Sequence, residues 1–125
     1  MGYLAHRWRS VGFAWQGIKF LLATQANARI HALATVIVVL AGVYFQVSRL
    51  EWLALVAAIA WVWVAEALNT GLECVVDLVS PQQHPKAAQA KDVAAAGVLL
   101  ASVAAVVVGA IVFGPKLMPA VWGGS

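Results

Sequence analysis

The chain has 125 residues, of which 63% are hydrophobic and 10% are charged, and its formal net charge is +3. Its mean hydropathy of +0.87 excludes an ordinary soluble protein, and its length excludes more than one domain. The single cysteine, Cys74, excludes an internal disulfide. We expect one integral membrane domain over residues 1–125, with no nucleic-acid partner.

The N-terminal segment, at about residues 3–23, interleaves aromatic and basic side chains. Trp8 and Trp15 alternate with Arg7 and Lys19 along this segment. A helix of this composition lies in the membrane interface, with its aromatic rings at the depth of the lipid headgroups. We therefore predict an amphipathic surface helix ahead of the first membrane span.

Three apolar runs follow, at about residues 29–47, 50–70 and 92–113. Each has close to the 20 residues that a helix needs to cross a hydrocarbon core about 30 Å thick. We predict three transmembrane helices and no sheet, because a membrane-spanning backbone must satisfy its own hydrogen bonds. The third run is rich in alanine and glycine, which favours close helix packing in lipid. A protomer this small cannot easily enclose a polar site, so we expect an oligomer with shared sites.

The connections predict how these helices are joined. The Ser48-Arg49 connection is short and forces an antiparallel hairpin, and we expect Glu51 to lie in this loop. Pro81 and Pro85 should end the second span, because proline removes a backbone donor and restricts the residue before it. Gly114-Pro115 predicts the end of the third span.

Basic residues are unevenly divided between the two sides of the predicted spans. Of eight in all, two (Arg49 and Lys116) lie on one side, and the rest lie before the first span or between the second and third. An excess of basic residues marks the cytoplasmic side. We therefore expect a multi-pass protein with a cytoplasmic N-terminus, in which polar residues at the end of the second span face the cytoplasm.

Polar side chains recur along the second span at spacings of three and four residues. Glu66, Asn69, Thr70, Glu73 and Asp77 fall within about 100° of one helix face. A carboxylate at the centre of a bilayer costs roughly 2.5–3.5 kcal/mol on insertion scales, so such residues usually mark a functional site. We expect the function to lie along this polar stripe.

The stripe suits magnesium-dependent phosphoryl transfer. The sequence has no phosphate-binding glycine loop and no cysteine–histidine metal cluster. Mg²⁺ takes one or two protein carboxylates and completes its shell with water and phosphate oxygens, and Glu73 and Asp77 lie near the cytoplasmic end. Glu66 lies roughly 10 Å deeper in the membrane than Glu73, at about 1.5 Å per residue. A carboxylate at that depth is placed to take a proton from a lipid hydroxyl. Lys91-Asp92 begins the third span and is suited to phosphate or metal.

Structural roles are open for the same residues. Glu66 and Asn69 can join helices by hydrogen bonds. Glu73 and Asp77 can be solvated charges at a helix end, and Lys91-Asp92 can flank and cap the third span.

The order of these residues resembles a family signature. The run EALNTGLECVVD at residues 66–77, with Lys91-Asp92 beginning fourteen residues after its end, resembles the signature of the prokaryotic diacylglycerol kinase family. The resemblance covers about residues 5–115. It implies a small homotrimeric enzyme of the bacterial inner membrane, with three transmembrane helices and an amphipathic surface helix.

The resemblance also implies roles for individual residues. Glu66 matches the catalytic base that deprotonates the primary hydroxyl of the lipid, and Glu73 matches a magnesium ligand. Asn69 and Arg29 match positions at the lipid substrate. The positions that match the nucleotide region are Asp77, His84, Lys91 and Asp92. Phe13 also falls in this region, but the family commonly has a tyrosine there, and Phe13 cannot donate a hydrogen bond. The implied cofactor is Mg²⁺, with ATP as the co-substrate.

The other departure from the family pattern concerns the metal site. The family usually has a glutamate, a second metal ligand, two residues before Asn27, where this chain has Gln25. An amide oxygen can bind Mg²⁺ but brings no charge. We therefore expect Gln25 to give weaker metal affinity, or to leave more of the binding to Glu73, Asp77 and ATP.

Together these features predict a lipid kinase that transfers the γ-phosphate of MgATP to the primary hydroxyl of a lipid alcohol. The alcohol is diacylglycerol or undecaprenol, and the product is phosphatidic acid or a polyprenyl phosphate. The run N-x-R-I-H at residues 27–31 resembles the undecaprenol kinase branch. The alternatives are a small proton-coupled transporter that uses Glu66, which would not need charges gathered at the cytoplasmic mouth, and a non-catalytic membrane subunit, which would not need Glu66.

Overall fold

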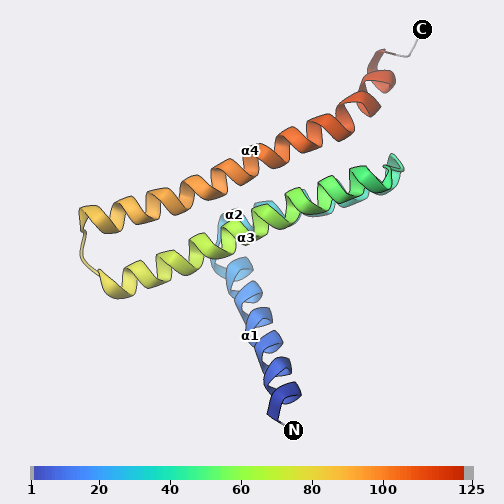
Figure 1. Cartoon of the computed structure of the whole chain (residues 1–125). Coiled ribbons are helices and arrows are strands. Elements are labelled where there is room, and N and C mark those ends of the chain that lie inside the picture. The colour runs from blue at the N-terminus through green and yellow to red at the C-terminus, as the bar shows by residue number, and fades with distance from the viewer. Residues whose placement is uncertain (1, 123–125) are drawn as a thin grey trace.

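Four helices make up the structure, a computed structural model that describes residues 2–122 and the side chains of residues 2–118. The helices are α1 (Gly2–Thr24), α2 (Ala26–Tyr44), α3 (Arg49–Val79) and α4 (Pro85–Trp122), and the described residues contain no strand (Figure 1). α2, α3 and α4 are each long and apolar enough to cross a membrane. The prediction of an all-α chain with three candidate spans behind an N-terminal helix is confirmed.

The helices differ in length, and this difference positions the polar stripe. α3 and α4 run antiparallel, α2 packs beside α3, and α1 points away from the other three (Figure 1). α3 has 31 residues and α2 has 19, which correspond to roughly 46 and 28 Å at 1.5 Å per residue. Because a tight turn aligns the two helices at one end, α3 extends beyond α2 at the other. Glu73 and Asp77 lie on this overhang.

The turn between α2 and α3 is fixed by local hydrogen bonds. Gln46 has a positive φ of 51°, and the Val47 amide donates to the Gly42 carbonyl at 3.1 Å. Ser48 and Glu51 form a capping box, in which each backbone amide donates to the other side chain at 3.1 Å. The expectation that Glu51 lies in the loop is wrong, because the capping box starts α3 at Arg49 and places Glu51 in its first turn.

The same end of the molecule holds α4 against α3. Val47, Leu55 and Val112 form a small buried apolar cluster. Next to it, Lys116 Nζ lies 2.8 Å from Glu51 Oε2. Apolar packing and an ion pair therefore hold the helices together at this end, whereas the polar stripe lies toward the opposite end.

The two predicted proline breaks have different outcomes. α3 ends at Val79 and α4 begins at Pro85, as expected from Pro81 and Pro85. The predicted end at Gly114-Pro115 is wrong, because α4 continues past both residues. Gly114 has no positive φ, so it does not form the left-handed helix end that glycine favours. Pro115 removes one backbone donor, a loss that a long apolar helix tolerates.

Most of the apolar surface of the three spans is left uncovered by the chain itself. Large side chains such as Leu40, Trp61 and Val106 are more than half exposed, at 64%, 69% and 71%. Surfaces of this extent on a monomer mark contact with lipid or with other protein. They are suited to acyl chains or to further membrane helices.

Candidate active site

Glu66 is the largest fully buried side chain among the described residues, with an exposed fraction of 1%. It lies on α3, and its Oε2 atom has no hydrogen-bond partner in the described part of the chain. Leaving a buried acceptor unsatisfied costs about 1–3 kcal/mol, and more for a charged group. A role as a purely structural hydrogen bonder therefore does not explain Glu66, because its Oε2 atom stays unsatisfied within the described part of the chain.

His31 of α2 provides the neighbouring polar group. Its Nε2 atom lies 3.5 Å from Glu66 Oε2, and the imidazole meets the Trp63 ring edge-on at a centroid distance of 6.4 Å. Trp63 Nε1 donates to Thr35 Oγ1 at 3.0 Å, and Thr35 Oγ1 donates to the His31 carbonyl at 2.7 Å. The Trp63–Thr35 hydrogen bond and the ring contact join α2 to α3 beside Glu66.

His31, Thr35 and Trp63 were not among the predicted site residues. A signal was present, since His31 and Thr35 are polar residues four apart in an apolar helix and therefore share a face. Spacing within one helix, however, does not show which face of the next helix it meets.

Two further buried oxygens follow Glu66 on α3. Asn69 and Thr70 are 8% and 3% exposed, and Asn69 Oδ1 and Thr70 Oγ1 have no hydrogen-bond partner among the described residues. Buried polar side-chain atoms are usually satisfied, so unsatisfied ones need an explanation. Asn69 lines a groove between α3 and α4, whereas Thr70 lines a hollow between α1 and α3. The polar stripe therefore borders more than one hollow of the molecule.

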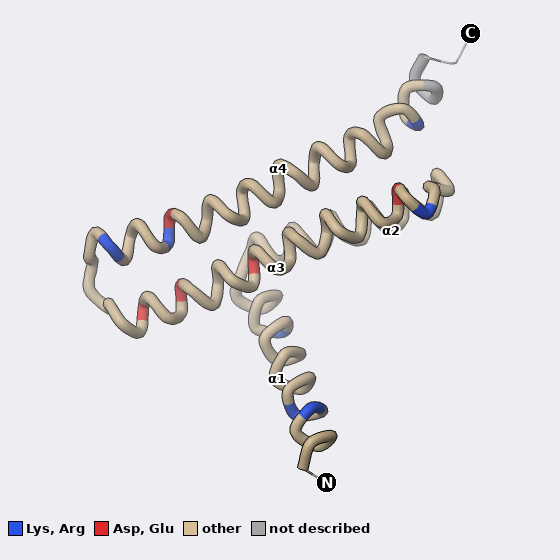
Figure 2. Tube along the Cα trace, viewed as in Figure 1, with Lys and Arg blue, Asp and Glu red and all other residues tan. Residues whose placement is uncertain are grey.

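Charged residues gather where α3 turns into α4 (Figure 2). Lys91 Nζ donates to Asp77 Oδ1 at 2.5 Å, which joins the overhang of α3 to the first turns of α4. Glu73 is half-buried one helical turn before Asp77, and its charge also acts on Lys91. The structure thus brings three of the predicted site residues together at this end of the helix pair.

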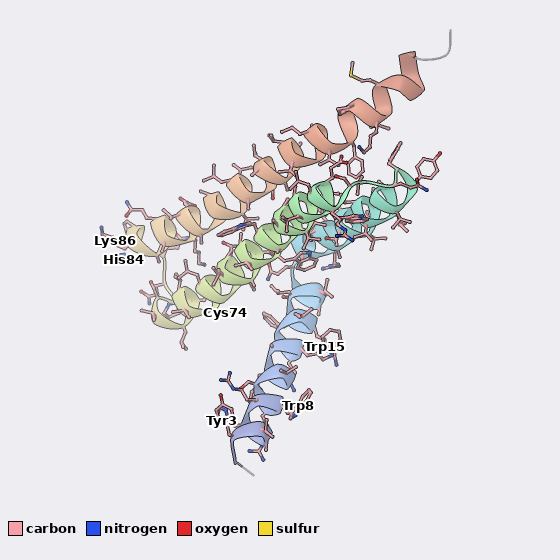
Figure 3. The ribbon with its side chains drawn as sticks, turned by 45° about the vertical axis from the view of Figure 1, so that its right-hand side comes forward. Tyr3, Trp8, Trp15, Cys74, His84 and Lys86 are labelled. Atoms are coloured by element: carbon pink, nitrogen blue, oxygen red, sulfur yellow. The ribbon has the colours of Figure 1, made fainter. Side chains whose placement is uncertain are left out.

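His84 caps the start of α4. Its Nδ1 atom accepts from the Lys86 amide at 3.0 Å, and both residues lie at the turn between α3 and α4 (Figure 3). Lys91, Asp77 and His84 line a pocket of about 630 Å³ beside this turn. His84 is therefore a helix cap whose ring borders the same hollow as the ion pair.

An apolar groove of about 990 Å³ runs between α3 and α4. Small residues of α4, among them Gly97 and Ala101, form one wall, and Asn69 is the polar side chain in its lining. The groove is long, apolar and ends beside the polar stripe. Such a shape is suited to a hydrocarbon chain or to a neighbouring helix.

Four predicted site residues are not brought into this cluster. Phe13 on α1 is 69% exposed, and Arg29 and Asp92 are exposed with no side-chain hydrogen bond or ion pair among the described residues. Gln25 is half-buried at the start of α2, and its Nε2 atom donates to Thr24 Oγ1 at 3.3 Å. Their roles stay predictions.

Residues 12–113 match the family described as Prokaryotic diacylglycerol kinase. This match covers most of the chain and includes α2, α3 and the greater part of α4. The chain belongs to the prokaryotic diacylglycerol kinase family. The resemblance drawn from residues 66–77 and from Lys91-Asp92 is confirmed, and with three apolar helices the chain is a multi-pass membrane protein.

Three relatives illustrate the range of the family. A Diacylglycerol kinase of Synechocystis sp. is 41% identical over 110 residues, which are 87% of this chain and 63% of the relative. An Undecaprenol kinase of Bacillus subtilis is 35% identical over 109 residues, 87% of this chain and 89% of the relative. A Diacylglycerol kinase of Escherichia coli is 27% identical over 99 residues, 79% and 81% of the two chains. The chain thus spans less than two thirds of the Synechocystis protein.

The donor groups of the site fit a magnesium ion that arrives with phosphate. Among the residues with described side chains, no three His, Cys, Asp or Glu residues gather closely enough to hold a metal. Glu73 offers a half-buried carboxylate, and Gln25 offers an amide whose nitrogen is turned to Thr24. Mg²⁺ is commonly bound through one or two carboxylates plus substrate phosphates, and this chain can supply that share.

Proposed function

We propose that this chain is an ATP-dependent lipid kinase, which transfers the γ-phosphate of ATP to the primary hydroxyl of a lipid alcohol. The family and the three relatives described above carry kinase names. The observation that carries the proposal is the buried Glu66 side chain, whose Oε2 atom has no hydrogen-bond partner among the described residues, on the same helix as Asp77, which pairs with Lys91 of α4. Glu66 and Asp77 lie about 16 Å apart along α3, at 1.5 Å per residue.

This arrangement separates two chemical tasks. Glu66, in the apolar part of the helix pair, takes the proton of the lipid hydroxyl. The hydroxyl oxygen then attacks the γ-phosphorus, the bond to the oxygen bridging the β- and γ-phosphates breaks, and ADP leaves. Direct transfer is favoured, because no side chain in the sequence stands out as a phosphorylated intermediate. The product is phosphatidic acid or a polyprenyl phosphate.

The nucleotide occupies the charged end of the helix pair. Lys91 offers an ammonium group to phosphate oxygens, and Asp77 holds that ammonium in place. Asp92, His84 and Phe13 complete the proposed nucleotide-binding set. Charge neutralisation and positioning are the main requirements of phosphoryl transfer, and the hollow beside the turn has the polar lining that this task needs.

Magnesium would be held by Glu73, with Gln25 as a second, uncharged ligand. When bound, Mg²⁺ neutralises charge on the transferring phosphate. The rest of its shell would come from ATP and water, since the described side chains form no larger ligand cluster.

The lipid alcohol would enter from the bilayer. Asn69 lines the apolar groove and has a free Oδ1 atom, so it can receive the hydroxyl end of the lipid, with Arg29 as a second proposed contact. The relatives named above include both diacylglycerol and undecaprenol kinases. Diacylglycerol and undecaprenol are therefore tested as two separate substrates in the assay described below.

The proposed setting is the bacterial inner membrane, with the N-terminus in the cytoplasm and three chains in a homotrimer with shared active sites. The uncovered apolar surfaces and the groove beside the small residues of α4 support contact between copies. The excess of basic residues before α2 and near the start of α4 supports the orientation.

The proposal is tested by following labelled phosphate. Purified protein in mixed micelles is incubated with magnesium and ATP labelled at the γ-phosphate, together with diacylglycerol or undecaprenol. Triacylglycerol, which has no free hydroxyl, is the matched control. We expect magnesium-dependent label in the lipid phase with one alcohol preferred, and none with triacylglycerol.

Two results would count against this function. Absence of labelled lipid with either alcohol, from protein whose helical content is intact, would remove the kinase proposal. Movement of a cargo across vesicles in step with protons, without lipid phosphorylation, would favour the transporter instead.

A further inference from the structure

The contact between His31 and Glu66 has no counterpart elsewhere in the described part of the chain. Both side chains are largely buried, at 15% and 1% exposed. His31 Nε2 and Glu66 Oε2 face each other at 3.5 Å, and neither atom has a hydrogen-bond partner among the described residues. Two unsatisfied polar atoms pointed at one another inside an apolar helix pair form a unit rather than two separate defects.

We propose that His31 is a positioning residue for Glu66: its Nε2–H donates to Glu66 Oε2 and leaves Oε1 directed at the lipid hydroxyl. This inference rests on the proposed kinase function. The distance is longer than the usual hydrogen-bond range of about 2.7–3.2 Å. Contacts of this kind are often long before the substrate binds and shorten in the reactive complex.

The surroundings of His31 support this role. The Trp63 ring packs edge-on against the imidazole, and Trp63 is itself held by its bond to Thr35. Thr35 in turn donates to the His31 carbonyl. Trp63 and Glu66 are three residues apart and so lie on the same side of α3. The imidazole is therefore packed against Trp63, on the side of α3 that carries Glu66.

No other basic side chain competes for this carboxylate. Within the described residues, His31 is the single basic group within 4 Å of Glu66. Of the other helices that pack on α3, α1 carries Lys19 over the Trp15 ring and α4 carries Lys91 on Asp77. Arg29 on α2 is exposed, and the remaining acidic groups of the stripe, Glu73 and Asp77, follow on α3 itself.

Three substitutions of His31 test the inference, because they differ in whether a side-chain donor can reach Glu66. In His31→Gln, the amide nitrogen is as far from the backbone as Nε2 and can donate to Glu66. In His31→Asn, the amide is one bond shorter and cannot. His31→Phe keeps the ring but removes the donor. We expect His31→Phe and His31→Asn to lower kcat roughly 10- to 100-fold, the range found when the hydrogen-bond partner that orients a metal-ligating side chain is lost.

The three variants should differ in kcat and not in nucleotide binding. We expect the KM for ATP to stay at the wild-type value in all of them, because the proposed nucleotide end lies further along α3, and we expect His31→Gln to recover most of the rate. His6→Phe, at an exposed histidine of α1, is the matched control and should behave as wild type. Equal rates for the glutamine and asparagine variants, or a wild-type rate for His31→Phe, would overturn the inference.

A spectroscopic measurement makes the test independent of turnover. In protein with ¹⁵N-labelled histidine, Glu66→Gln should move the ring-nitrogen signals of His31 and leave those of His6 and His84 in place. Unmoved His31 signals would overturn the contact. If wild-type protein phosphorylates no lipid while the His31 signals do move, the kinase function fails and the His31–Glu66 contact stands.

Discussion

The Asp77–Lys91 ion pair joins α3 to α4 where the nucleotide is proposed to bind. Lys91 is 39% exposed and Asp77 is 66% exposed, so water screens the pair and it adds little to folding. We expect Lys91→Gln to raise the KM for ATP roughly tenfold, the effect of one lost charge-assisted hydrogen bond, and to leave the thermal unfolding midpoint unchanged. Steady-state kinetics and thermal unfolding measure the two effects.

Lys86→Gln provides the matched control for this substitution. Lys86 lies at the same end of α4, and its hydrogen bond in the structure is made by its backbone amide. A lower midpoint with unchanged KM in Lys91→Gln would show that the ion pair serves folding and not nucleotide binding.

The proposed role of Gln25 in metal binding can be tested by replacing its amide with a carboxylate. Gln25→Glu adds the charge that the family usually places there. We expect the magnesium concentration for half-maximal activity to fall several-fold, because a carboxylate is the stronger ligand for a hard cation. Gln16→Glu, which adds the same charge on exposed α1, should leave it unchanged. An unchanged magnesium dependence in Gln25→Glu would remove Gln25 from the metal site.

The site residues differ in how well the sequence predicts them. The spacing of Glu66, Asn69 and Glu73 placed them on one helix face because helical geometry is local and regular. His31 was not predicted, because its contact with Glu66 depends on how α2 and α3 are rotated relative to one another. That rotation is set by packing around Trp63 and Thr35, which no spacing rule within a helix contains.

At the scale of elements, the α2–α3 pair depends on a close contact at its turn. A Cβ added to Gly42 would lie 2.5 Å from Trp52 Cη2, so Gly42 allows the indole to pack directly on α2. We expect Gly42→Ala to destabilise the folded state by about 1–3 kcal/mol, the usual cost of overpacking. Thermal or denaturant unfolding in detergent measures this change.

Gly12→Ala serves as its control. Nothing lies within 4 Å of a Cβ at Gly12, so this change should be neutral or should stabilise α1 slightly through helix propensity. A neutral Gly42→Ala would mean that Trp52 moves aside without cost, and that the contact does not fix the helix pair.

Sequence signals for helix ends differ in how reliably they predict where a helix begins or stops. Ser48 and Glu51 cap α3 because each satisfies a backbone donor of the other, and their spacing is a sequence signature. Pro115 carries the opposite signal, yet α4 continues through it. A proline ends a helix only when nothing else favours continuing, and an apolar helix in lipid has few other ways to satisfy its backbone.

At the scale of the whole molecule, orientation can be tested at the two ends of the bundle. With Cys74 replaced by serine, Gln82→Cys lies at the α3–α4 turn and Met118→Cys lies at the far end of α4. In intact cells, a membrane-impermeant thiol reagent should label Met118→Cys and should label Gln82→Cys only after the membrane is opened. The reverse labelling would contradict a cytoplasmic N-terminus.

Glu66→Gln tests the proposal that this buried carboxylate serves as the base in lipid phosphorylation. Glutamine keeps the shape of the side chain but cannot accept the proton. We predict at least a 100-fold loss of kcat for phosphate transfer to the preferred lipid alcohol, in the range found for general bases, with helical content and the KM for ATP retained. Glu51→Gln, which can keep the capping box at the opposite end, should transfer phosphate at the wild-type rate. Wild-type transfer by Glu66→Gln would contradict the claim.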